Sequence, residues 1–548
     1  MKILFLGINA RYTHSNLALY YLRNSILGSD YEWEILETSI NADELETTNI
    51  IFQHRPDVLC LSVYIWNTLF VSRLLPLVRI VLPKTIIVAG GPEITYPNPF
   101  IETLFPYIDF AIQGAGEKAF KHLSEQNFQH SEKFFSIPAT SFRDIPFPYL
   151  PSDAPLLKNK YVYYESSRGC PFQCSFCLSS RTDVVLEYKA LETVKEELKQ
   201  LIALEPRLVK FVDRSFNADR IFAREIWRYL IELNPGITFH FEIKPDLLQD
   251  EDIEVLSKAP VGLFQFEIGL QSTHPTTLET INRANNFETI KPYLIRVNRL
   301  ENIHTHLDLI IGLPYDTITS FGKSFNDAIS TLPRYLQLGF LKVLPGTEIA
   351  KQESEFKLKA MPYPPYQLLK NKWLSFEELM NLEQFTHWFD LFYNSEKMTS
   401  TLHYIIEQIE DPYHFFSELF NYCTENGLVP HKDYYAAFSY LTEFISWKYH
   451  SFVDYLLDSL LYDWCVNVHS PKYPPQLRID SSNILKNEIY AILRTNPDAL
   501  PQELLSAKPY FKKALFAQFS NNEFITSKLS GKSRMVVYQD DGLHLILW

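Results

Sequence analysis

The sequence SSRGCPFQCSFCLSS, at residues 166–180, holds half of the six cysteines of the chain. Cys170, Cys174 and Cys177 are spaced Cys-x-x-x-Cys-x-x-Cys. Thiolates are the ligands of iron–sulfur clusters, and so short a loop can wrap three of them around one face of a cube, leaving the fourth iron open. A disulfide framework would need cysteines spread densely through a small secreted chain. The segment therefore predicts a metal site.

A structural zinc site is the alternative interpretation of the three cysteines. Zinc takes four protein ligands at such sites, and the nearest histidines in the sequence, His130 and His240, are far from the cysteines. A fourth ligand from elsewhere in the fold keeps this alternative open. A chance cluster of buried thiols is less favoured still.

The cysteine segment follows the first of six apolar runs that alternate with helical stretches such as residues 191–204. The six runs are residues 161–167, 208–213, 237–243, 262–268, 304–311 and 335–343. Six such units fit a partial barrel better than a complete eight-stranded one. In barrels of this kind, the loops after the strands form the mouth where reactive groups gather, so we expect the cysteines at that mouth.

The first ~140 residues show a similar alternation of strand and helix. The apolar runs are residues 2–9, 33–38, 57–64, 85–91 and 110–116, with helical patterns at 17–27 and 69–82. Nearly continuous apolar strands separated by helices predict a parallel sheet covered on both faces, the doubly wound class. Turns at residues 90–92 and 114–117 follow strand ends, where such folds bind ligands.

Two proline-rich stretches suggest boundaries, at residues 138–160 and 360–366. We therefore expect a first domain over residues 1–140, a linker over 141–160, a barrel over 161–350 and a mainly helical domain over 365–548. The last of these is rich in aromatic residues that we assign to its core, and Asp541-Gly542 predicts a terminal hairpin. Cys423 and Cys465 stand alone in aromatic helical patterns, so we expect buried thiols.

The overall composition excludes several classes of protein. Hydrophobic residues make up 46% and aromatic residues 15% of the 548-residue chain, which excludes a disordered protein. The net charge of −14 disfavours a general nucleic-acid binder. No run of about 18 apolar residues predicts a membrane span. The start, MKILFLGINARYTHS, is too short and too soon polar for a signal peptide, so the cytoplasm is the expected location.

With Phe176 as the aromatic residue before Cys177, the motif Cys-x-x-x-Cys-x-aromatic-Cys resembles the signature of the radical S-adenosylmethionine (SAM) superfamily. The resemblance implies a [4Fe-4S] cluster whose open iron binds the amino and carboxylate groups of SAM. A reduced cluster then cleaves the sulfonium and gives a 5′-deoxyadenosyl radical, while the barrel shields the radical.

The resemblance covers roughly residues 160–350. Similar segments stand at residues 211–217, 241–243, 267–272, 308–314 and 344–347, in order and at barrel spacing. It implies that Glu242 is placed to hold a ribose hydroxyl. For Asp213, a helix cap is the less favoured alternative to SAM binding. The residues that it assigns to SAM are Phe176, Asp213, Glu242, Gln271, Ser272 and Leu344.

The first domain is similar to the Rossmann-like cobalamin-binding module of the cobalamin-dependent radical SAM subclass. The similarity rests on Asp57-Val58, residues 62–67, residues 90–93 and residues 109–117. Glycines let the backbone approach a large ring, and Tyr64 and Trp66 would cover its apolar face. The residues so assigned to cobalamin are Tyr12, His14, Ser62, Tyr64, Trp66, Asn67, Gly90, Gly91, Glu93, Gly114, Gly116 and Glu117.

One motif of corrinoid proteins is missing from the first domain. The Asp-x-His-x-x-Gly sequence that supplies an axial histidine is absent, and His14 is the only nearby candidate. The resemblance therefore implies a corrinoid without a lower histidine ligand. His14 is then either a loop donor near the ligand or a surface histidine. A domain that has lost cobalamin remains an alternative.

Methylthiotransferases that modify tRNA share the barrel but are excluded by the cysteine count. Their first domain supplies three more cysteines for a second cluster, whereas here it has only Cys60, within an apolar run that predicts a core thiol. The acidic charge also argues against tRNA.

The leading hypothesis is an anaerobic radical SAM enzyme with cobalamin as methyl carrier, acting on an unreactive carbon of a small molecule. It implies a low-potential electron donor of the flavodoxin or ferredoxin type, and no nucleic acid or membrane as partner. One alternative is a radical SAM cyclase or oxidative enzyme of the same architecture. The other is a non-catalytic corrinoid or redox sensor. The C-terminal domain resembles an appended domain of uncharacterised function, which we expect to cap the barrel mouth.

Overall fold

The computed structural model describes residues 1–179, 185–283, 285–430, 433–449, 452–477 and 479–548, without the side chains of 479–481. Internal contacts divide the chain into two compact units. The first unit comprises residues 1–321 and 337–379, and the second comprises residues 322–336 and 380–548. The domain boundaries expected from the sequence stay predictions.

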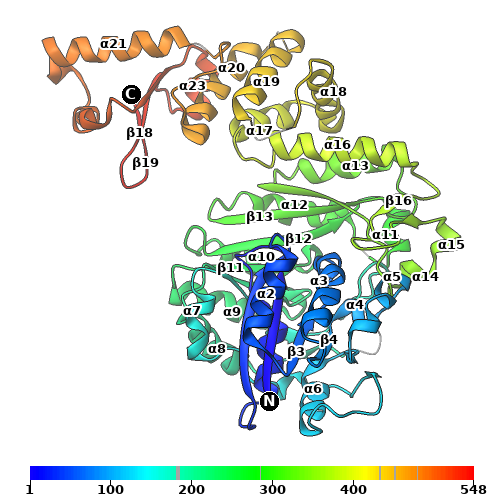
Figure 1. The fold of residues 1–548 in the computed structure, drawn as a ribbon. Helices are drawn as coiled ribbons and strands as arrows, with labels where there is room; N and C mark the ends of the chain where they lie inside the picture. Colours follow the sequence, from blue (N-terminus) through cyan, green and yellow to red (C-terminus); the bar gives the residue numbers. More distant parts are fainter. Residues whose placement is uncertain (180–184, 284, 431–432, 450–451, 478) are drawn as a thin grey trace. The chain divides into compact units, whose positions relative to one another are not determined.

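The first unit begins with a six-stranded sheet in the order β2-β1-β3-β4-β5-β6. Its strands β3 and β4 are labelled in the blue part of the ribbon in Figure 1. Every strand pair in it is parallel. Its strands are β1 (Lys2–Asn9), β2 (Glu32–Ser39), β3 (Val58–Ser62), β4 (Ile86–Gly90), β5 (Phe110–Ile112) and β6 (Phe134–Phe135). Because β1 and β3 are buried along almost their whole length, both faces of the sheet are covered.

Helices cover this sheet in two pairs. The pairs are α1 (Leu17–Ser25) with α6 (Gly116–Glu125), and α2 (Glu44–His54) with α3 (Thr68–Val81). The core between sheet and helices is built from Leu, Ile and Val side chains such as Leu59 and Leu74. This arrangement confirms the doubly wound fold predicted from the apolar runs.

A second six-stranded sheet in the same unit has the order β7-β10-β11-β12-β13-β14. Its strands are β7 (Tyr161–Tyr164), β10 (Leu208–Phe211), β11 (Thr238–Ile243), β12 (Phe264–Gln271), β13 (Ile303–Ile311) and β14 (Tyr335–Phe340). The helices between them include α8 (Leu191–Ile202), α9 (Arg220–Leu233), α10 (Asp250–Leu256), α12 (Phe287–Asn298) and α13 (Ile318–Ile329). In the described part of the chain β7 and β14 are the two edges of this sheet, so the six-stranded partial barrel is confirmed.

The two faces of the second sheet differ in polarity. Along β12 and β13, buried residues alternate with partly exposed ones. Phe266 and Phe241 pack against Trp227 of α9, so the apolar side chains face the helices. The alternate residues, such as Glu242 and Glu267, therefore point to the concave interior.

The second unit is mainly helical, as expected. Phe385, Phe389, Phe416 and Phe420 pack around Phe325 and one another, so these aromatic side chains form part of its core. Its helices include α16 (Phe376–Phe392), α17 (Thr399–Gln408), α18 (Pro412–Glu425), α19 (Tyr434–Lys448), α20 (Val453–Asp463) and α21 (Ile479–Thr495).

The chain ends in a three-stranded antiparallel sheet of β17 (Leu515–Gln518), β18 (Arg534–Gln539) and β19 (Leu543–Leu547). The β18–β19 hairpin confirms the turn predicted at Asp541-Gly542. The third strand, β17, was not predicted. Cys423 and Cys465 are fully buried, as predicted.

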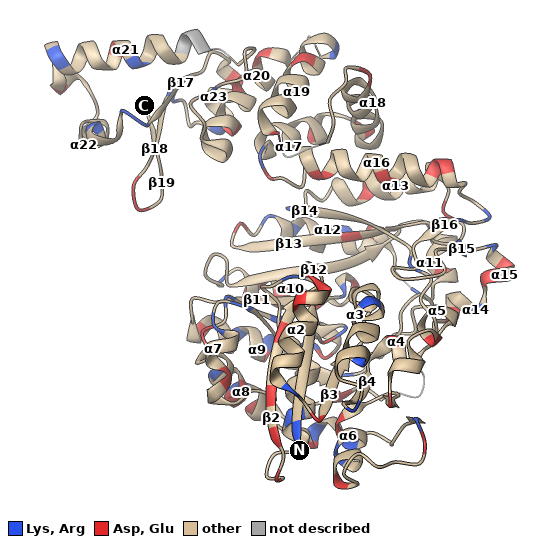
Figure 2. Cartoon of the chain, viewed as in Figure 1, with Lys and Arg blue, Asp and Glu red and all other residues tan. Residues whose placement is uncertain are grey.

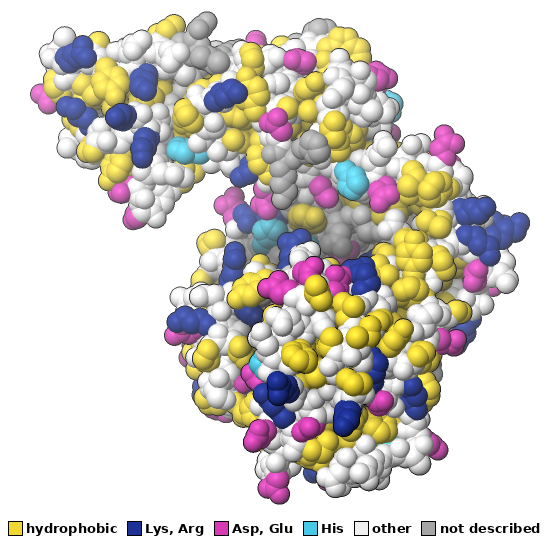
Figure 3. Space-filling view, viewed as in Figure 1, with side chains coloured by type: hydrophobic (Ala, Val, Ile, Leu, Met, Phe, Trp, Pro, Cys, Tyr) yellow, Lys and Arg dark blue, Asp and Glu magenta, His cyan; other side chains and the backbone are white. Residues whose placement is uncertain are grey.

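Charged side chains of both signs occur along the helices of each unit (Figure 2). On the face shown in Figure 3, Lys and Arg side chains lie among Asp and Glu side chains over most of the first unit. Within the residues described, we find no helix with both the length and the apolar character needed to cross a membrane.

Candidate cofactor site

The cysteine segment follows β7 of the second sheet. A short two-stranded ladder pairs the residues just before the cysteines with residues after them. There β8 (Ser167–Arg168) pairs with β9 (Glu187–Tyr188). Between this ladder and Cys170, Gly169 has φ +100°, and a Cβ on it would lie 2.9 Å from the Val185 carbonyl oxygen. Only glycine fits this turn without strain, so the entry of the segment is fixed by backbone geometry.

The other end of the cysteine segment is bound to loops of the barrel mouth. Ser175 donates its N–H to the Ile281 carbonyl oxygen at 3.2 Å, and Ile349 donates to the Ser175 carbonyl oxygen at 2.8 Å. These partners follow β12 and β14 respectively. The cysteines therefore lie at the carboxyl ends of the strands, as the sequence predicts.

Arg283 is a functional candidate that sequence reasoning missed. Its Nη1 lies 3.9 Å from Cys174 Sγ, and its Nη2 donates to the Gly269 carbonyl oxygen at 2.5 Å. Burial raises the pKa of the Cys174 thiol, whereas the Arg283 charge lowers it. A cation beside a buried thiol favours the thiolate that metal binding needs. No local motif marks this arginine, which is 109 residues from Cys174.

The three thiols carry the donor chemistry of an iron–sulfur cluster. Burial and the neighbouring thiols Cys177 and Cys174 both raise the pKa of Cys170. Thiolates are the ligands of such clusters, so the segment fits one by the chemistry of its donors. Among the described residues, the trio of His, Cys, Asp or Glu side chains whose ligand atoms all lie within 4.8 Å is Asp540, Asp541 and His544, at the terminal hairpin.

The residues assigned to SAM are brought partly together at the barrel mouth. Glu242 lies on the concave face of β11, and burial raises its pKa to about 7. Gln271 ends β12 at an irregularity in strand pairing with φ +72°, and a Cβ on Gly269 would collide with its side chain. Phe176 is half-buried beside Cys177. Leu344 lies in the loop after β14, where its carbonyl oxygen accepts from Thr347 Oγ1 at 2.6 Å.

Asp213 has a different place from either of those considered. It is buried and accepts hydrogen bonds from Ser166 N at 3.0 Å and from the Ser166 and Ser167 hydroxyls at 2.6 Å. It does not cap α9, because Asp219 accepts from the first N–H groups of that helix. Asp213 thus fixes the turn before the cysteines, and its assignment to SAM stays a prediction.

Ser272, also assigned to SAM, is buried and serves its own turn. Its hydroxyl accepts from the His274 N–H at 3.1 Å and hydrogen-bonds Asp316. Burial raises the pKa of Asp316. The Ser272 hydroxyl, which the sequence analysis assigned to SAM, therefore stabilises the loop after β12.

A polar interior lies below the mouth, on the concave face of the second sheet. Lys210 Nζ and His240 Nε2 each lie 3.2 Å from Glu267 Oε2, which lowers the pKa of Glu267 despite its burial. Asp308 Oδ1 and His240 Nδ1 are buried, and no hydrogen-bond partner for either stands among the described residues. Buried polar atoms without partners indicate room for a ligand. The alternating polarity of β11–β13 is the signal that would have predicted this interior.

The carboxyl edge of the first sheet meets both edges of the second. On the β7 side, His14 Nδ1 lies 2.5 Å from the Tyr163 hydroxyl, and Ser15 donates to the Tyr161 carbonyl oxygen at 3.1 Å. On the β14 side, Glu93 Oε2 accepts from the Tyr366 hydroxyl at 2.5 Å. A Cβ on Gly346 would collide with the Tyr96 ring. The edge that binds ligands in doubly wound folds thus faces the open side of the barrel.

An aromatic pair stands on this edge. The rings of Tyr64 and Trp66 stack with centroids 4.3 Å apart and an angle of 6°, and Trp66 is 43% exposed. Asn67 is fully buried, and its amide donates to the Ile8 and Ser62 carbonyl oxygens at 3.0 Å. Asn67 therefore stabilises the turn that carries Tyr64 and Trp66. Its own amide group is hydrogen-bonded to the backbone of the first sheet.

The remaining residues assigned to cobalamin divide by environment. A Cβ on Gly91, at φ +101°, would lie 2.7 Å from the Val63 carbonyl oxygen, so this turn requires glycine.

His14 is half-buried, and burial lowers its pKa, so it is no surface histidine. Tyr12 is 75% exposed. Four others lie as follows: Ser62 bonded to Asn16, Gly90 ending β4, Gly114 beside open space, and Gly116 starting α6.

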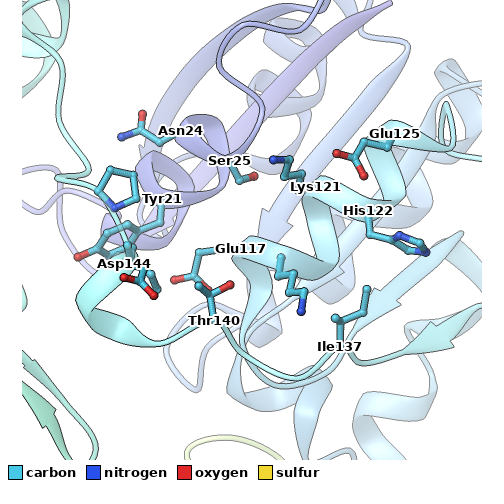
Figure 4. A pocket seen from close by; sticks show the side chains of 13 residues that line it. Tyr21, Asn24, Ser25, Glu117, Lys121, His122, Glu125, Ile137, Thr140 and Asp144 are labelled. Atoms are coloured by element: carbon cyan, nitrogen blue, oxygen red, sulfur yellow. The ribbon is translucent and has the colours of Figure 1, made fainter.

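Glu117 forms an ion pair with Arg168 at 2.9 Å rather than facing open space. It also borders a cavity of about 630 Å³ between α1, α6 and residues 137–146 (Figure 4). Lys121 and His122 of α6 line this cavity opposite Asp144. The cysteines do not line it, so it is separate from the barrel mouth.

Three family models match the chain in succession. The model described as B12 binding domain matches residues 3–124, and the model described as Radical SAM superfamily matches residues 164–328. The model described as protein of unknown function DUF4080 matches residues 354–538.

The proteins similar to the chain include two relatives and one solved structure. TokK of Streptomyces tokunonensis, a cobalamin-dependent radical SAM methyltransferase, is 28% identical over 57% of this chain and 51% of its own length. The 2-(S-pantetheinyl)-carbapenam-3-carboxylate methyltransferase of Streptantibioticus cattleyicolor is 28% identical over 50% of this chain and 45% of its own. The chain thus spans about half the length of these relatives.

The solved structure is that of OxsB, a cobalamin-dependent SAM radical enzyme, with aqua-cobalamin bound. It superposes with a TM-score of 0.59 at 13% identity, over 89% of this chain and 83% of OxsB. This likeness shows the fold. The chain therefore matches the B12 binding domain and radical SAM superfamily models in succession, on a fold similar to that of a cobalamin-dependent SAM radical enzyme, and its C-terminal region matches a model of unknown function.

Proposed function

We propose that this protein is a cobalamin-dependent radical SAM enzyme that adds a methyl group to an unreactive carbon of a small molecule. The carrying observation is that the three cysteines lie at the mouth of a partial barrel whose open side faces the ligand-binding edge of the B12-binding sheet. The two proposed cofactor sites would thus face one another, which supports a reaction in which both take part.

When bound, the cluster supplies the electron that splits SAM into methionine and a 5′-deoxyadenosyl radical, and cobalamin carries the methyl group. Cys170, Cys174 and Cys177 would hold the cluster, with Arg283 stabilising the Cys174 thiolate. Glu242 and Gln271, on neighbouring strands, would orient the ribose of SAM.

On the other side of the interior, Tyr64 and Trp66 would pack on the corrin ring, and Gly91 and Gly114 would let the backbone approach it. His14 hydrogen-bonds Tyr163 through Nδ1, which supports a role as a loop donor near the corrin. Because the axial histidine motif is absent from the sequence, we propose a corrin without a lower histidine ligand.

The substrate would bind in the polar interior between the two cofactors. Lys210, His240 and Glu267 form a connected hydrogen-bonding group there, and the side chains of Lys210 and Glu267 are 30% and 29% exposed. Such groups suit a small polar molecule. We further propose cytoplasmic, anaerobic action with a flavodoxin- or ferredoxin-type electron donor, without nucleic acid or membrane as partner.

The test is anaerobic reconstitution of the full chain with iron, sulfide and hydroxocobalamin, followed by SAM and a strong reductant. We expect cluster and corrin absorbance bands, 5′-deoxyadenosine, and methylcobalamin formed from SAM without any added substrate. The Cys174→Ala variant should lose most of the cluster absorbance and the 5′-deoxyadenosine. Cys60→Ala, which removes a buried thiol of the first sheet, is the matched control and should keep both.

Each alternative makes a different prediction for the same samples. Formation of 5′-deoxyadenosine without methylcobalamin would contradict methyl transfer and favour cyclisation or oxidation. Binding of both cofactors without any SAM cleavage would favour a non-catalytic sensor. Full cluster absorbance in Cys174→Ala would refute the ligand assignment.

A further inference from the structure

Arg168 joins the cysteine segment to the first domain. It lies two residues before Cys170, at the end of β8. Its Nη1 donates to Glu117 Oε1 at 2.9 Å, and its Nη2 donates to Glu165 Oε2 at 2.6 Å. Glu117 stands in the first turn of α6, directly after the Gly114 turn of the B12-binding sheet. One side chain therefore spans from the proposed cluster loop to the proposed corrin edge.

The Arg168 guanidinium is held in place by aromatic rings as well as carboxylates. It lies 4.8 Å from the Phe142 ring centroid and 5.5 Å from that of Tyr21. Glu187, which pairs with Arg168 between β8 and β9, accepts from the Phe142 N–H. Arginine suits this position because its planar group stacks on rings while it bonds two carboxylates. The side chain is thus a fixed connection rather than a mobile surface cation.

The Arg168–Glu117 pair and the aromatic stack stand on the same edge of the first sheet, because Tyr64 follows β3 and Glu117 begins α6 after β5. Tyr64 stacks on Trp66, the pair that we propose packs on the corrin. A ligand at this edge therefore meets groups that contact Arg168 directly.

We propose that Arg168 is a positioning residue that couples corrinoid binding in the first domain to the geometry of the cysteine segment. This inference rests on the proposed function. A corrin that shifts Glu117 changes the direction in which Arg168 is held, and Arg168 is joined to Cys170 through Gly169 alone. Coupling between two ligand sites is reciprocal, so SAM at the cluster must change the affinity for the corrin by the same factor.

The test measures this factor by titrating hydroxocobalamin into cluster-loaded, anaerobic full-length protein, with and without saturating SAM. In the wild type we expect SAM to change the Kd for hydroxocobalamin about fivefold or more, the lower end of measured couplings. In Arg168→Gln and in Glu117→Gln the ratio of the two Kd values should fall to about one. The double variant should do no more than either single change, because both remove the same connection.

A second readout is the electron paramagnetic resonance signal of the reduced cluster with SAM. The addition of reduced hydroxocobalamin should alter this signal in the wild-type protein. It should leave the signal unchanged in Arg168→Gln and in Glu117→Gln. A merely structural role for Arg168 would not remove this response selectively.

Two variants separate coupling from folding. Glu117→Gln leaves Arg168 paired with Glu165 and stacked on Phe142, so the segment keeps its other supports. Arg73→Gln breaks an exposed ion pair with Glu44 elsewhere in the same domain, and should keep the wild-type ratio.

The possible outcomes distinguish this inference from the function on which it rests. If the wild type binds both cofactors but shows no linkage, or if both variants keep the wild-type ratio, the coupling is refuted and the proposed function stands. If the wild type binds no corrin or does not cleave SAM, the proposed function is refuted and the coupling with it.

Discussion

At the scale of single residues, three buried carboxyl groups of the barrel interior have different proton affinities. Glu267 contacts Lys210 and His240, which outweigh its burial and lower its pKa. Burial raises the pKa of Glu242 to about 7, and burial together with the charges of Glu267 and Glu242 raises the pKa of Asp308. At neutral pH we therefore expect Glu267 to be ionised, whereas Glu242 and Asp308 are able to hold protons.

The pKa of Glu242 gives a pH prediction for SAM binding. Accepting hydrogen bonds from ribose hydroxyls favours the carboxylate, whose fraction rises about tenfold between pH 6 and pH 8 when the pKa is about 7. We expect the affinity of cluster-loaded protein for SAM to rise about tenfold over that range, measured by anaerobic calorimetry. Glu242→Gln should bind more weakly and lose the pH dependence.

A matched control for this prediction is Glu254→Gln. Glu254 is an exposed residue of α10 whose carboxylate pairs with Lys258. It should keep the wild-type profile. A pH profile of Glu242→Gln that follows the wild type would contradict the assignment of Glu242 to the ribose.

At the scale of elements, the turn between β4 and α4 (Pro92–Thr95) is set by close backbone approach. Gly91 has φ +101°, and the Val63 carbonyl oxygen is 2.7 Å from the position of a Cβ. The Val63 N–H in turn donates to the Gly90 carbonyl oxygen at 2.8 Å. The loops after β3 and β4 therefore support each other, which fixes the aromatic pair beside them.

We expect Gly91→Ala to destabilise the first unit by about 2–4 kcal/mol, because the left-handed backbone and the collision with Val63 act together. Gly114→Ala also has a positive φ, +82°, but open space around it, so it should cost only about 1 kcal/mol. Urea unfolding followed by circular dichroism measures both. Equal effects of the two substitutions would show that the Val63 contact contributes nothing.

At the scale of the whole chain, the segment expected to be a linker over residues 141–160 is tied to the first domain. Arg23 of α1 is fully buried and forms a two-point ion pair with Asp153, at 3.0 Å and 2.7 Å. Arg23 Nη2 also donates to the Pro148 carbonyl oxygen at 3.1 Å. The segment therefore packs as a strap between the two sheets of the first unit.

Arg23→Met should destabilise the first unit by about 3–5 kcal/mol, because it leaves the Asp153 charge buried without its partner. The double variant Arg23→Met/Asp153→Leu should recover much of this loss, since no unpaired charge remains. Denaturant midpoints of the two variants provide the measurement. Arg73→Ala, at an exposed pair, should cost less than about 1 kcal/mol. A double variant no more stable than Arg23→Met would contradict this account.

Much of the fold was predictable from the sequence because the patterns that specify it are local. Continuous apolar runs predicted the strands of both sheets except the two-residue β6 (Phe134–Phe135), and Cys170, Cys174 and Cys177 stand within one loop. The burial of Cys60, Cys423 and Cys465 followed from the apolar patterns around them. These features depend on neighbours a few residues away, which periodicity and spacing record.

What only the tertiary structure decided is which parts of the chain each polar side chain bonds to. The polar atoms of Asp213, Ser272 and Asn67 bond to nearby turns, while their assignment to cofactors stays a prediction. Conversely, Arg283 meets Cys174 across 109 residues, and Arg168 meets Glu117 across 51. Such partnerships depend on strand register and on how loops from two sheets meet, and hydrophobic patterning carries no information about either.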